Sequence, residues 1–318
     1  MNPAEAAGTA FGLALDATGF RAFDTLSAGE ACRRVEIVLD EADNLTKDLK
    51  ASPRACLVDR RFPSGRQMLR VEQLDGNGYW VAAPGYGRHL ISSDGRRIRS
   101  ALPRVPALQW QRLFFAQVLP LAAALQGLEI LHASAVVLDG RALGFVAPSG
   151  TGKTSLAVNL AAEGAEFLTD DVLALDVSTA TPTAYEGARL VNVARHEYAA
   201  LDPAARVRLG SVIGRTAKVH VRPAEARSSA PLAALYFLRR DSSRSGAVEI
   251  RTDEDGSRLV LGSGFITYLS EAHHQLAHLE ASARIARAVP LFRVDVPGNR
   301  AAADVSAAVA EHAASELG

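Results

Sequence analysis

Residues Ala147 to Thr154 read A-P-S-G-T-G-K-T, and most of what the sequence predicts depends on this octet. It fits the phosphate-binding loop pattern, with alanine in place of the first glycine. Gly150 and Gly152 allow the backbone to bend so that its N–H groups converge on a phosphate. In such a loop Lys153 brings a positive charge to the β- and γ-phosphates, and the Thr154 hydroxyl binds Mg²⁺. The octet therefore predicts a site for a nucleotide phosphate.

The residues around the octet supply the setting that such a loop needs. Leu143 to Val146 is a short apolar run, which is typical of a buried strand. After the loop, the spacing of Leu156 and Leu160 predicts a helix that ends at Gly164 and whose positive N-terminal end faces the same anion. A Gly-rich turn before an ordinary helix is the alternative, but strand, turn and helix together favour phosphate binding. The expected contacts are Pro148, Ser149, Gly150, Thr151, Gly152, Lys153, Thr154 and Ser155.

The composition limits the classes of protein to which this chain can belong. With 318 residues, the chain is long enough for one large domain or two modest ones, each with its own core. Its 35 lysines and arginines balance 35 aspartates and glutamates, so it lacks the basic footprint of a general nucleic-acid binder. We therefore expect no nucleic-acid partner.

Other features predict a cytoplasmic protein without a membrane span. Cys32 and Cys56 lack metal-ligand spacing and are interpreted as reduced thiols. The start of the chain, M-N-P-A-E-A-A-G-T-A, has no basic segment followed by an apolar core, so no signal peptide is predicted. The most apolar stretch, Leu113 to Leu138, is broken by Pro120 and by polar residues, which favours a helix and a strand.

Residues 1 to about 105 predict a smaller, β-rich N-terminal domain. In this region D-G-N-G at 75–78 is a hairpin turn signal between two strand-like runs. Pro103 and Pro106 mark the end of the region. Residues 106–318 would then form a second domain that contains the phosphate-binding loop.

The second domain opens with helical spacing over 108–127, where Pro120 is expected to kink the helix or to end it early. Two apolar runs, 129–138 and 141–146, follow and are joined by a D-G turn, a strong hairpin signal that leads straight into the loop. Strand-like and helix-like runs then follow one another, so the predicted fold class is α/β. The remaining predicted strands are 233–238, 248–252 and 291–296, and the remaining helices are 268–288 and 301–316.

Two adjacent carboxylates, Asp170 and Asp171, follow the helix of the loop after one short turn and the run F-L-T. Phosphoryl transfer needs positioned phosphates, a metal ion and often a carboxylate that accepts the proton of the nucleophile. Our hypothesis makes Asp170 the general base and Asp171 a Mg²⁺ contact. On an extended backbone adjacent side chains diverge, so only a turn would aim both at one site. The alternative is a solvated aspartate pair that initiates a turn.

Two further residues have competing interpretations. Asp176 ends the apolar run V-L-A-L and would hold the metal if this run were a Walker B strand, but it also fits a core strand that ends in a turn aspartate. His132 lies within an apolar run, where a lone histidine is usually a packed core residue. Because its strand precedes the strand of the loop, a position beside the γ-phosphate is the functional alternative.

The motifs L-H-A-S-A-V, a D-G turn, A-P-S-G-T-G-K-T and E-F-L-T-D-D together resemble the catalytic domain of HPr kinase/phosphorylase. The closer resemblance is to the looser group of HPr-kinase-related proteins, which includes lasso peptide kinases. It covers roughly residues 105 to 315. It implies a phosphate-loop kinase fold similar to that of phosphoenolpyruvate carboxykinase. By position it implies that His132 is the active-site histidine, Asp170 the catalytic carboxylate and Asp171 its neighbour.

Together with the loop, the resemblance implies an ATP- and Mg²⁺-dependent kinase. Its expected catalytic residues are Asp170, His132 and Lys153, and its expected metal contacts are Thr154 and Asp171. The expected acceptor is a Ser or Thr hydroxyl of a peptide or small protein, such as a ribosomal peptide precursor, which the N-terminal domain would present.

Two other functions fit the same loop. A small-molecule kinase uses the same chemistry. A nucleotide-binding regulator without transferase activity belongs to a different class, and the paired aspartates argue against it because a sensor needs no base. The resemblance also implies an oligomer, in which the Ala-rich helix over 301–316 either forms an interface or packs on its own domain.

Overall fold

The chain is a mixed α/β protein with large sheets. Its computed structural model describes residues 8–17, 26, 29–76, 78–253 and 255–317. The start of the chain, on which the signal-peptide expectation rests, lies largely outside these residues, as does Asn77 of the predicted turn. The chain divides into two compact units: unit 1 comprises Met1–Leu128 and Ile266–Gln275, and unit 2 comprises Glu129–Phe265 and Leu276–Gly318.

Unit 1 is built on an antiparallel-rich sheet of eight strands in the order β1-β2-β3-β8-β7-β6-β5-β4. The predicted hairpin around 75–78 is confirmed, because β5 and β6 pair antiparallel on either side of this turn. Leu45 of α1 packs with Leu74, Trp80 and Leu90 in a small apolar cluster on this sheet. The elements are β1 (Gly8–Ala10), β2 (Leu13–Asp16), β3 (Arg33–Leu39), α1 (Ala42–Ala51), β4 (Arg54–Arg61), β5 (Gln67–Leu74), β6 (Gly78–Ala83), β7 (Gly87–Ile91) and β8 (Arg97–Ala101).

The helical segment α2 (Ala107–Leu113), η1 (Phe114–Val118) and α3 (Leu119–Leu125) belongs to unit 1. The boundary between the units therefore falls after Leu128, whereas the sequence places it after residue 105. Contacts across unit 1 explain the difference. The Gln126 side chain at the end of this segment donates to the Gly95 carbonyl at 2.9 Å, and the Phe114 ring lies 5.4 Å from that of His89.

Pro120 does not end this helix. The chain forms one π turn just before the proline, in which the Leu119 N–H group bonds the Phe114 carbonyl, and the α-helix then continues. A proline supplies no N–H group, and its ring clashes with the carbonyl four residues earlier. The π turn is a common way to accommodate such a break in the hydrogen-bond ladder.

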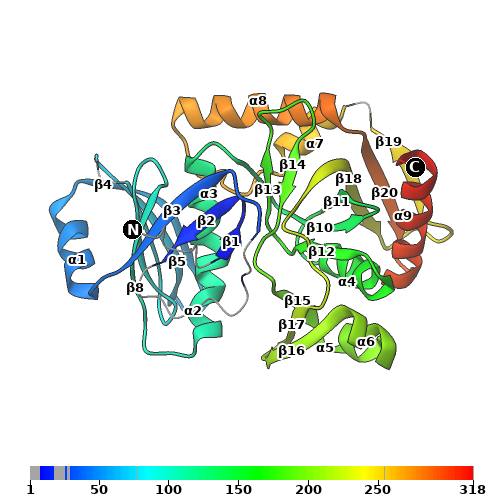
Figure 1. Cartoon of the computed structure of the whole chain (residues 1–318), viewed down its shortest axis with the longest axis horizontal. Coiled ribbons are helices and arrows are strands. Elements are labelled where there is room, and N and C mark those ends of the chain that lie inside the picture. Colours follow the sequence, from blue (N-terminus) through cyan, green and yellow to red (C-terminus); the bar gives the residue numbers. More distant parts are fainter. Residues whose placement is uncertain (1–7, 18–25, 27–28, 77, 254, 318) are drawn as a thin grey trace. The chain divides into compact units, whose positions relative to one another are not determined.

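Unit 2 is built on a nine-stranded mixed sheet with β18 near its centre (Figure 1). The path runs β12-β10-β11-β18-β14-β13-β9, and β20 pairs with β18 and with β19. The strand of the loop, β11, lies between its hairpin partner β10 and the parallel strand β18. The strands are β9 (Glu129–Leu131), β10 (Ala133–Leu138), β11 (Arg141–Val146), β12 (Glu166–Thr169), β13 (Leu173–Asp176), β14 (Thr183–Tyr185), β18 (Ser229–Asp241), β19 (Glu249–Thr252) and β20 (Leu291–Pro297).

The predicted hairpin before the loop is confirmed. Leu138 pairs with Arg141, and the two residues between them have positive φ angles, 50° for Asp139 and 76° for Gly140, as a type I′ turn requires. The single strand predicted over 129–138 is wrong, however. It divides at His132 into β9, which pairs with β13, and β10, which pairs with β11 and β12. Hydrophobic patterning detects an extended run but does not say which neighbour each part of it will pair with.

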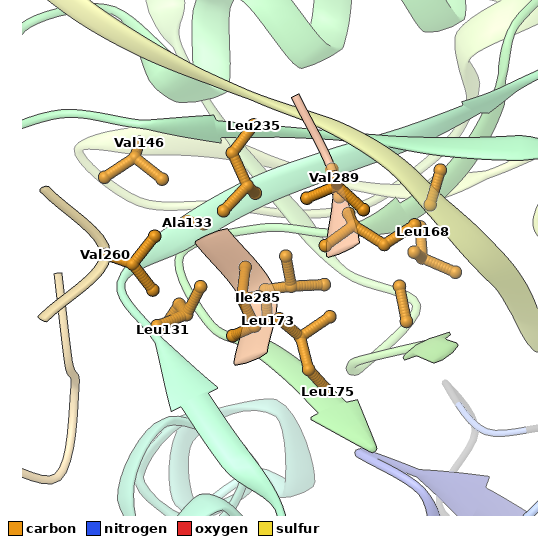
Figure 2. Close-up of a cluster of buried hydrophobic side chains, with 14 of the residues drawn as sticks. Leu131, Ala133, Val146, Leu168, Leu173, Leu175, Leu235, Val260, Ile285 and Val289 are labelled. Carbon is orange, nitrogen blue, oxygen red and sulfur yellow. The ribbon is translucent and has the colours of Figure 1, made fainter. Parts of the chain in front are cut away.

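Helices cover both faces of this sheet. On one face α4 (Lys153–Glu163) and α9 (Ala302–Leu317) pack through a cluster that contains Leu156, Tyr236 and Val305. On the other face Val260 of α7 (Gly256–Leu261) and Ile285 of α8 (Ala272–Ala288) pack against strand side chains, as Figure 2 shows. Since Val305, Val309 and Ala313 are buried in this way, the apolar face of α9 packs on its own unit.

A smaller sheet of three strands, β15 (Val191–Ala194), β17 (Lys218–Pro223) and β16 (Gly210–Arg215), completes unit 2 together with α5 (Arg195–Ala200) and α6 (Pro203–Leu209). It packs on α4, because Val158 of α4 is buried with Val191, Leu209 and Val219. This sheet carries Asn192 to the aspartate pair. In the part of the chain that the structure describes, no helix is long and apolar enough to cross a membrane.

Candidate functional site

The loop connects β11 directly to α4, in the strand–turn–helix order that the sequence predicts. Gly150 and Gly152 have φ angles of 83° and 115°, in the left-handed region that favours glycine. No side chain of the described residues caps the N-terminus of α4. Its first N–H groups have no partner within the helix, and together with the helix dipole they favour an anion at this end.

Lys153 is the first residue of α4 and is almost completely buried, with 4% of its surface exposed. Its ammonium group donates to the Ala147 carbonyl at 2.6 Å and lies 3.2 Å from the His132 ring. Burial lowers the pKa of Lys153, while the charges of Asp171 and Asp170 raise it in part. The lysine is thus held under the loop by groups that a phosphate oxygen can replace.

His132 lies between β9 and β10, at the break in the predicted strand, and is not a packed core residue. Its Nε2 faces Lys153, and its Nδ1 lies 2.9 Å from the Asp171 carbonyl. An ammonium group only donates and a carbonyl only accepts. Nδ1 therefore carries the hydrogen and Nε2 accepts from Lys153, so the arrangement requires a neutral imidazole. His132 links the lysine of the loop to the backbone of the aspartate pair.

Asp170 is the most strongly held side chain of the site. Its Oδ1 accepts hydrogen bonds from the hydroxyls of Thr154 at 2.8 Å and Ser134 at 3.0 Å, and its Oδ2 accepts from the Asn192 N–H group at 3.3 Å. Burial raises the pKa of Asp170 to about 6, and the charge of Asp171 adds to this effect. The hydrogen bonds oppose the shift but do not cancel it. A carboxyl group in this range can exchange a proton near neutral pH.

Asp171 supplies the turn that two neighbouring carboxylates need. Its φ angle is 65°, and its N–H group lies 3.3 Å from the Ser134 hydroxyl. The side chain of Asp171 is exposed, whereas that of Asp170 points into the hydrogen-bonded cluster. Asp176 belongs elsewhere: it ends β13, and its carboxylate accepts from the Ser178 N–H group at 2.9 Å, as a turn aspartate does.

Several residues of the site were not predicted from the sequence. Ser134 stands two residues after His132 and could have been found from the alternation of a strand. Asn192 contributes its backbone N–H group, for which no sequence signal exists. Its side chain accepts from the buried His220 ring, which also contacts the Thr216 hydroxyl. The Glu197 carboxylate accepts from the hydroxyl of Ser155.

Two pockets open beside the loop. The first, the glycine pocket, has a volume of about 220 Å³ and is lined by Gly150, Gly152 and Ser155 on one side and by Val296 and Val305 on the other. It therefore lies on the face of the sheet that α4 and α9 cover.

The second, the arginine pocket, has a volume of about 420 Å³ and reaches the loop at Ala147 and Pro148. His132 lines it, so it adjoins the end of Lys153 that carries the charge. Arg239, Arg258 and Arg293 also line this pocket.

The donor set fits a magnesium ion that a nucleotide brings with it. Within the described residues, no group of three or more His, Cys, Asp or Glu side chains could hold a metal by itself. Magnesium in nucleotide sites is usually bound by one or two carboxylates, by waters and by substrate phosphates. The Thr154 hydroxyl and the exposed Asp171 carboxylate provide oxygen ligands of this kind.

Comparison with known proteins finds similarity at the level of solved structures. No protein-family model and no curated protein sequence matches the chain. A solved structure, the HPr(Ser) kinase/phosphatase from Coxiella burnetii, is similar over 60% of this chain and 99% of its own, with 12% sequence identity and a TM-score of 0.35.

Proposed function

We propose that this chain is an ATP- and Mg²⁺-dependent kinase that transfers the γ-phosphoryl group to a hydroxyl. The observation that carries the proposal is the position of Asp170. A carboxyl group with a pKa raised to about 6 shares its Oδ1 with the hydroxyl of Thr154, one residue from the buried Lys153. A structural aspartate in a turn needs neither the raised pKa nor the phosphate loop.

The proposed reaction assigns one task to each side chain. The loop amides and Lys153 hold the phosphates, and the neutral ring of His132 keeps the lysine directed at them. Asp170, when ionised, accepts the proton of the acceptor hydroxyl as the new O–P bond forms and the bond from the γ-phosphorus to the bridging oxygen breaks, releasing ADP. Asp170 then returns the proton to solvent. Bound Mg²⁺ supplies positive charge that neutralises the phosphate oxygens.

The Thr154 hydroxyl donates its hydrogen to Asp170, which leaves its oxygen lone pairs for the metal. Asp171, the exposed carboxylate next to Asp170 in the chain, is proposed as the second metal contact. Asp171→Asn should then raise the Mg²⁺ concentration needed for half-maximal activity, whereas Asp170→Asn should lower kcat about a hundredfold or more. If instead Asp170→Asn raised the Mg²⁺ requirement and Asp171→Asn lowered kcat, Asp171 would be the base and Asp170 the metal contact.

We further propose that the acceptor is a Ser or Thr hydroxyl of a peptide or small protein. The test is incubation of the full chain with γ-labelled ATP and with peptide, protein and small-molecule acceptors. Label on a peptide supports the proposal, and label only on a small molecule identifies the small-molecule kinase. Tight ATP binding without transfer or hydrolysis would identify a nucleotide-binding regulator instead.

A further inference from the structure

Three arginines from separate elements of unit 2 line the arginine pocket. Arg239 comes from β18, Arg293 from β20 and Arg258 from α7. We propose that this pocket binds an anionic group of the phosphoryl acceptor, a carboxylate or a phosphate ester, and so selects acceptors in which such a group accompanies the hydroxyl. The inference rests on the proposed kinase function and names the chemical class of its second substrate.

The carboxylates around the pocket do not balance its arginines. Asp295 pairs with Arg239 at 2.9 Å, with Arg251, and at 3.7 Å with Arg244, which also pairs with Glu249. Hydrogen bonds and charges from Arg251 and Arg239 lower the pKa of Asp295 although its burial raises it, so this carboxylate stays ionised and shared. Of the arginines that Asp295 binds, Arg239 lines the pocket, and its single hydrogen bond to Asp295 leaves donors free for a further anion.

The other two arginines differ in their partners. Arg293 is paired with Asp253. Arg258 is exposed on α7, and no carboxylate among the described residues forms an ion pair with it. A guanidinium group presents N–H donors in a planar fork that matches a carboxylate or a phosphate. Arg258 is thus the arginine of the pocket with the most donors available to a ligand.

The loop itself indicates which pocket receives the acceptor. The backbone N–H groups of such a loop hold the α- and β-phosphates, and its lysine reaches the β- and γ-phosphates. The glycine pocket is lined by Gly150, Gly152 and Ser155, so it adjoins the nucleoside end of the triphosphate. The arginine pocket is lined by His132, whose ring faces the Lys153 ammonium group, so it adjoins the γ-phosphate.

The remaining walls of the arginine pocket suit an organic body between the hydroxyl and the anionic group. Val146, Phe237 and Leu259 line it, in addition to the arginines. Apolar walls with a few placed charged groups are typical of pockets for organic ligands. An acceptor bound here would direct its anionic group at Arg258 and its hydroxyl at the loop.

The test uses the full-length chain saturated with MgADP, so that the loop is occupied, and titrates succinate and O-phospho-L-serine by calorimetry. Wild-type protein should bind at least one of these probes, and Arg258→Gln should weaken that binding about tenfold or more. Arg284→Gln, which changes an exposed arginine outside the pocket, should leave it unchanged. The tighter of the two probes identifies a carboxylate or a phosphate ester as the preferred group.

Three results would overturn the inference: wild-type protein that binds neither probe, equal binding by Arg258→Gln and wild-type protein, or a loss of MgADP affinity in Arg258→Gln without a loss of anion binding. The last result would assign the pocket to the nucleotide. A wild-type chain that binds MgADP but neither probe leaves the kinase function standing. Conversely, probe binding through Arg258 in a chain that binds no MgADP would refute the kinase and not the pocket.

Discussion

Replacing Asp170 by asparagine should make the folded protein more stable at neutral pH while it removes the proposed base. Asp170 ordinarily titrates near 3.8, and in the folded protein its pKa is raised to about 6. Each unit of such a shift corresponds to about 1.4 kcal/mol, so keeping Asp170 ionised in the folded state costs up to about 3 kcal/mol. Asparagine has nearly the same shape and no charge, so it avoids this cost.

The sign of the effect depends on pH in a defined window. The folded protein binds the proton of Asp170 more tightly than the unfolded chain, so this group favours folding fully below about pH 3.8 and loses that contribution as the pH rises through about 6. The stability of Asp170→Asn relative to wild type should therefore increase by up to about 3 kcal/mol between pH 4 and pH 7. In the variant the NH2 group of the asparagine faces the Asn192 N–H group, so the hydrogen bond that Asp170 accepts there is lost. This loss costs about 1 kcal/mol at both pH values, so it cancels in the comparison between them.

The assay is urea unfolding of the full-length wild-type and variant chains at pH 4 and pH 7, with transfer from ATP measured in parallel. Asp295→Asn is a control, because the pKa of Asp295 is lowered, so its ionised form stabilises the folded state at both pH values and its loss should destabilise the protein with little change between pH 4 and pH 7. A difference between wild type and Asp170→Asn that does not change with pH would refute the reasoning. So would a wild-type transfer rate that fails to rise as the pH increases through about 6.

Three further changes test other parts of the site. Lys153→Met keeps the length of the side chain but removes its charge, so ATP affinity should fall about tenfold or more in titrations, and unchanged affinity would contradict the assignment of the loop. His220→Leu removes the buried hydrogen-bond partner of the Asn192 side chain, whose backbone N–H group holds Asp170. We expect kcat to fall and the acidic limb of the pH–rate profile to shift to higher pH, with ATP affinity constant. An acidic limb at the wild-type pH would indicate a purely structural role. Leu131→Ala, at a fully buried position, should lower the free energy of unfolding by about 2–5 kcal/mol, and a loss below about 1 kcal/mol would argue against its place in the core.

Local sequence signals predicted the elements that carry the site. The loop, its strand and helix, and the type I′ hairpin before it each depend on residues close together in the chain. Their glycines, D-G turn and apolar periodicity are properties of a few neighbouring residues. For this reason the structure has these elements at the residues that the sequence predicts.

The unit boundary and the division of the strand at His132 depended on partners distant in the chain. The helical segment belongs to unit 1, where the Gln126 side chain donates a hydrogen bond to the Gly95 carbonyl. The strand ends at His132 because β9 pairs with β13, whereas β10 pairs with β11 and β12. Hydrophobic patterning marks what is buried but not which partner buries it. Which strands pair depends on residues far apart in the chain, so no short segment predicts it.

By itself, the sequence determined a Gly-rich turn between a strand and a helix, with a lysine and a threonine, followed by two aspartates. Only the tertiary structure decided that Asp170 accepts hydrogen bonds from Thr154, Ser134 and the Asn192 N–H group. It also decided that His132 faces Lys153 and that three arginines line a pocket beside the loop. The physical reason is distance along the chain. A hydrogen bond or a shared charge between residues tens of positions apart exists only after strand pairing and helix packing have brought their backbones together.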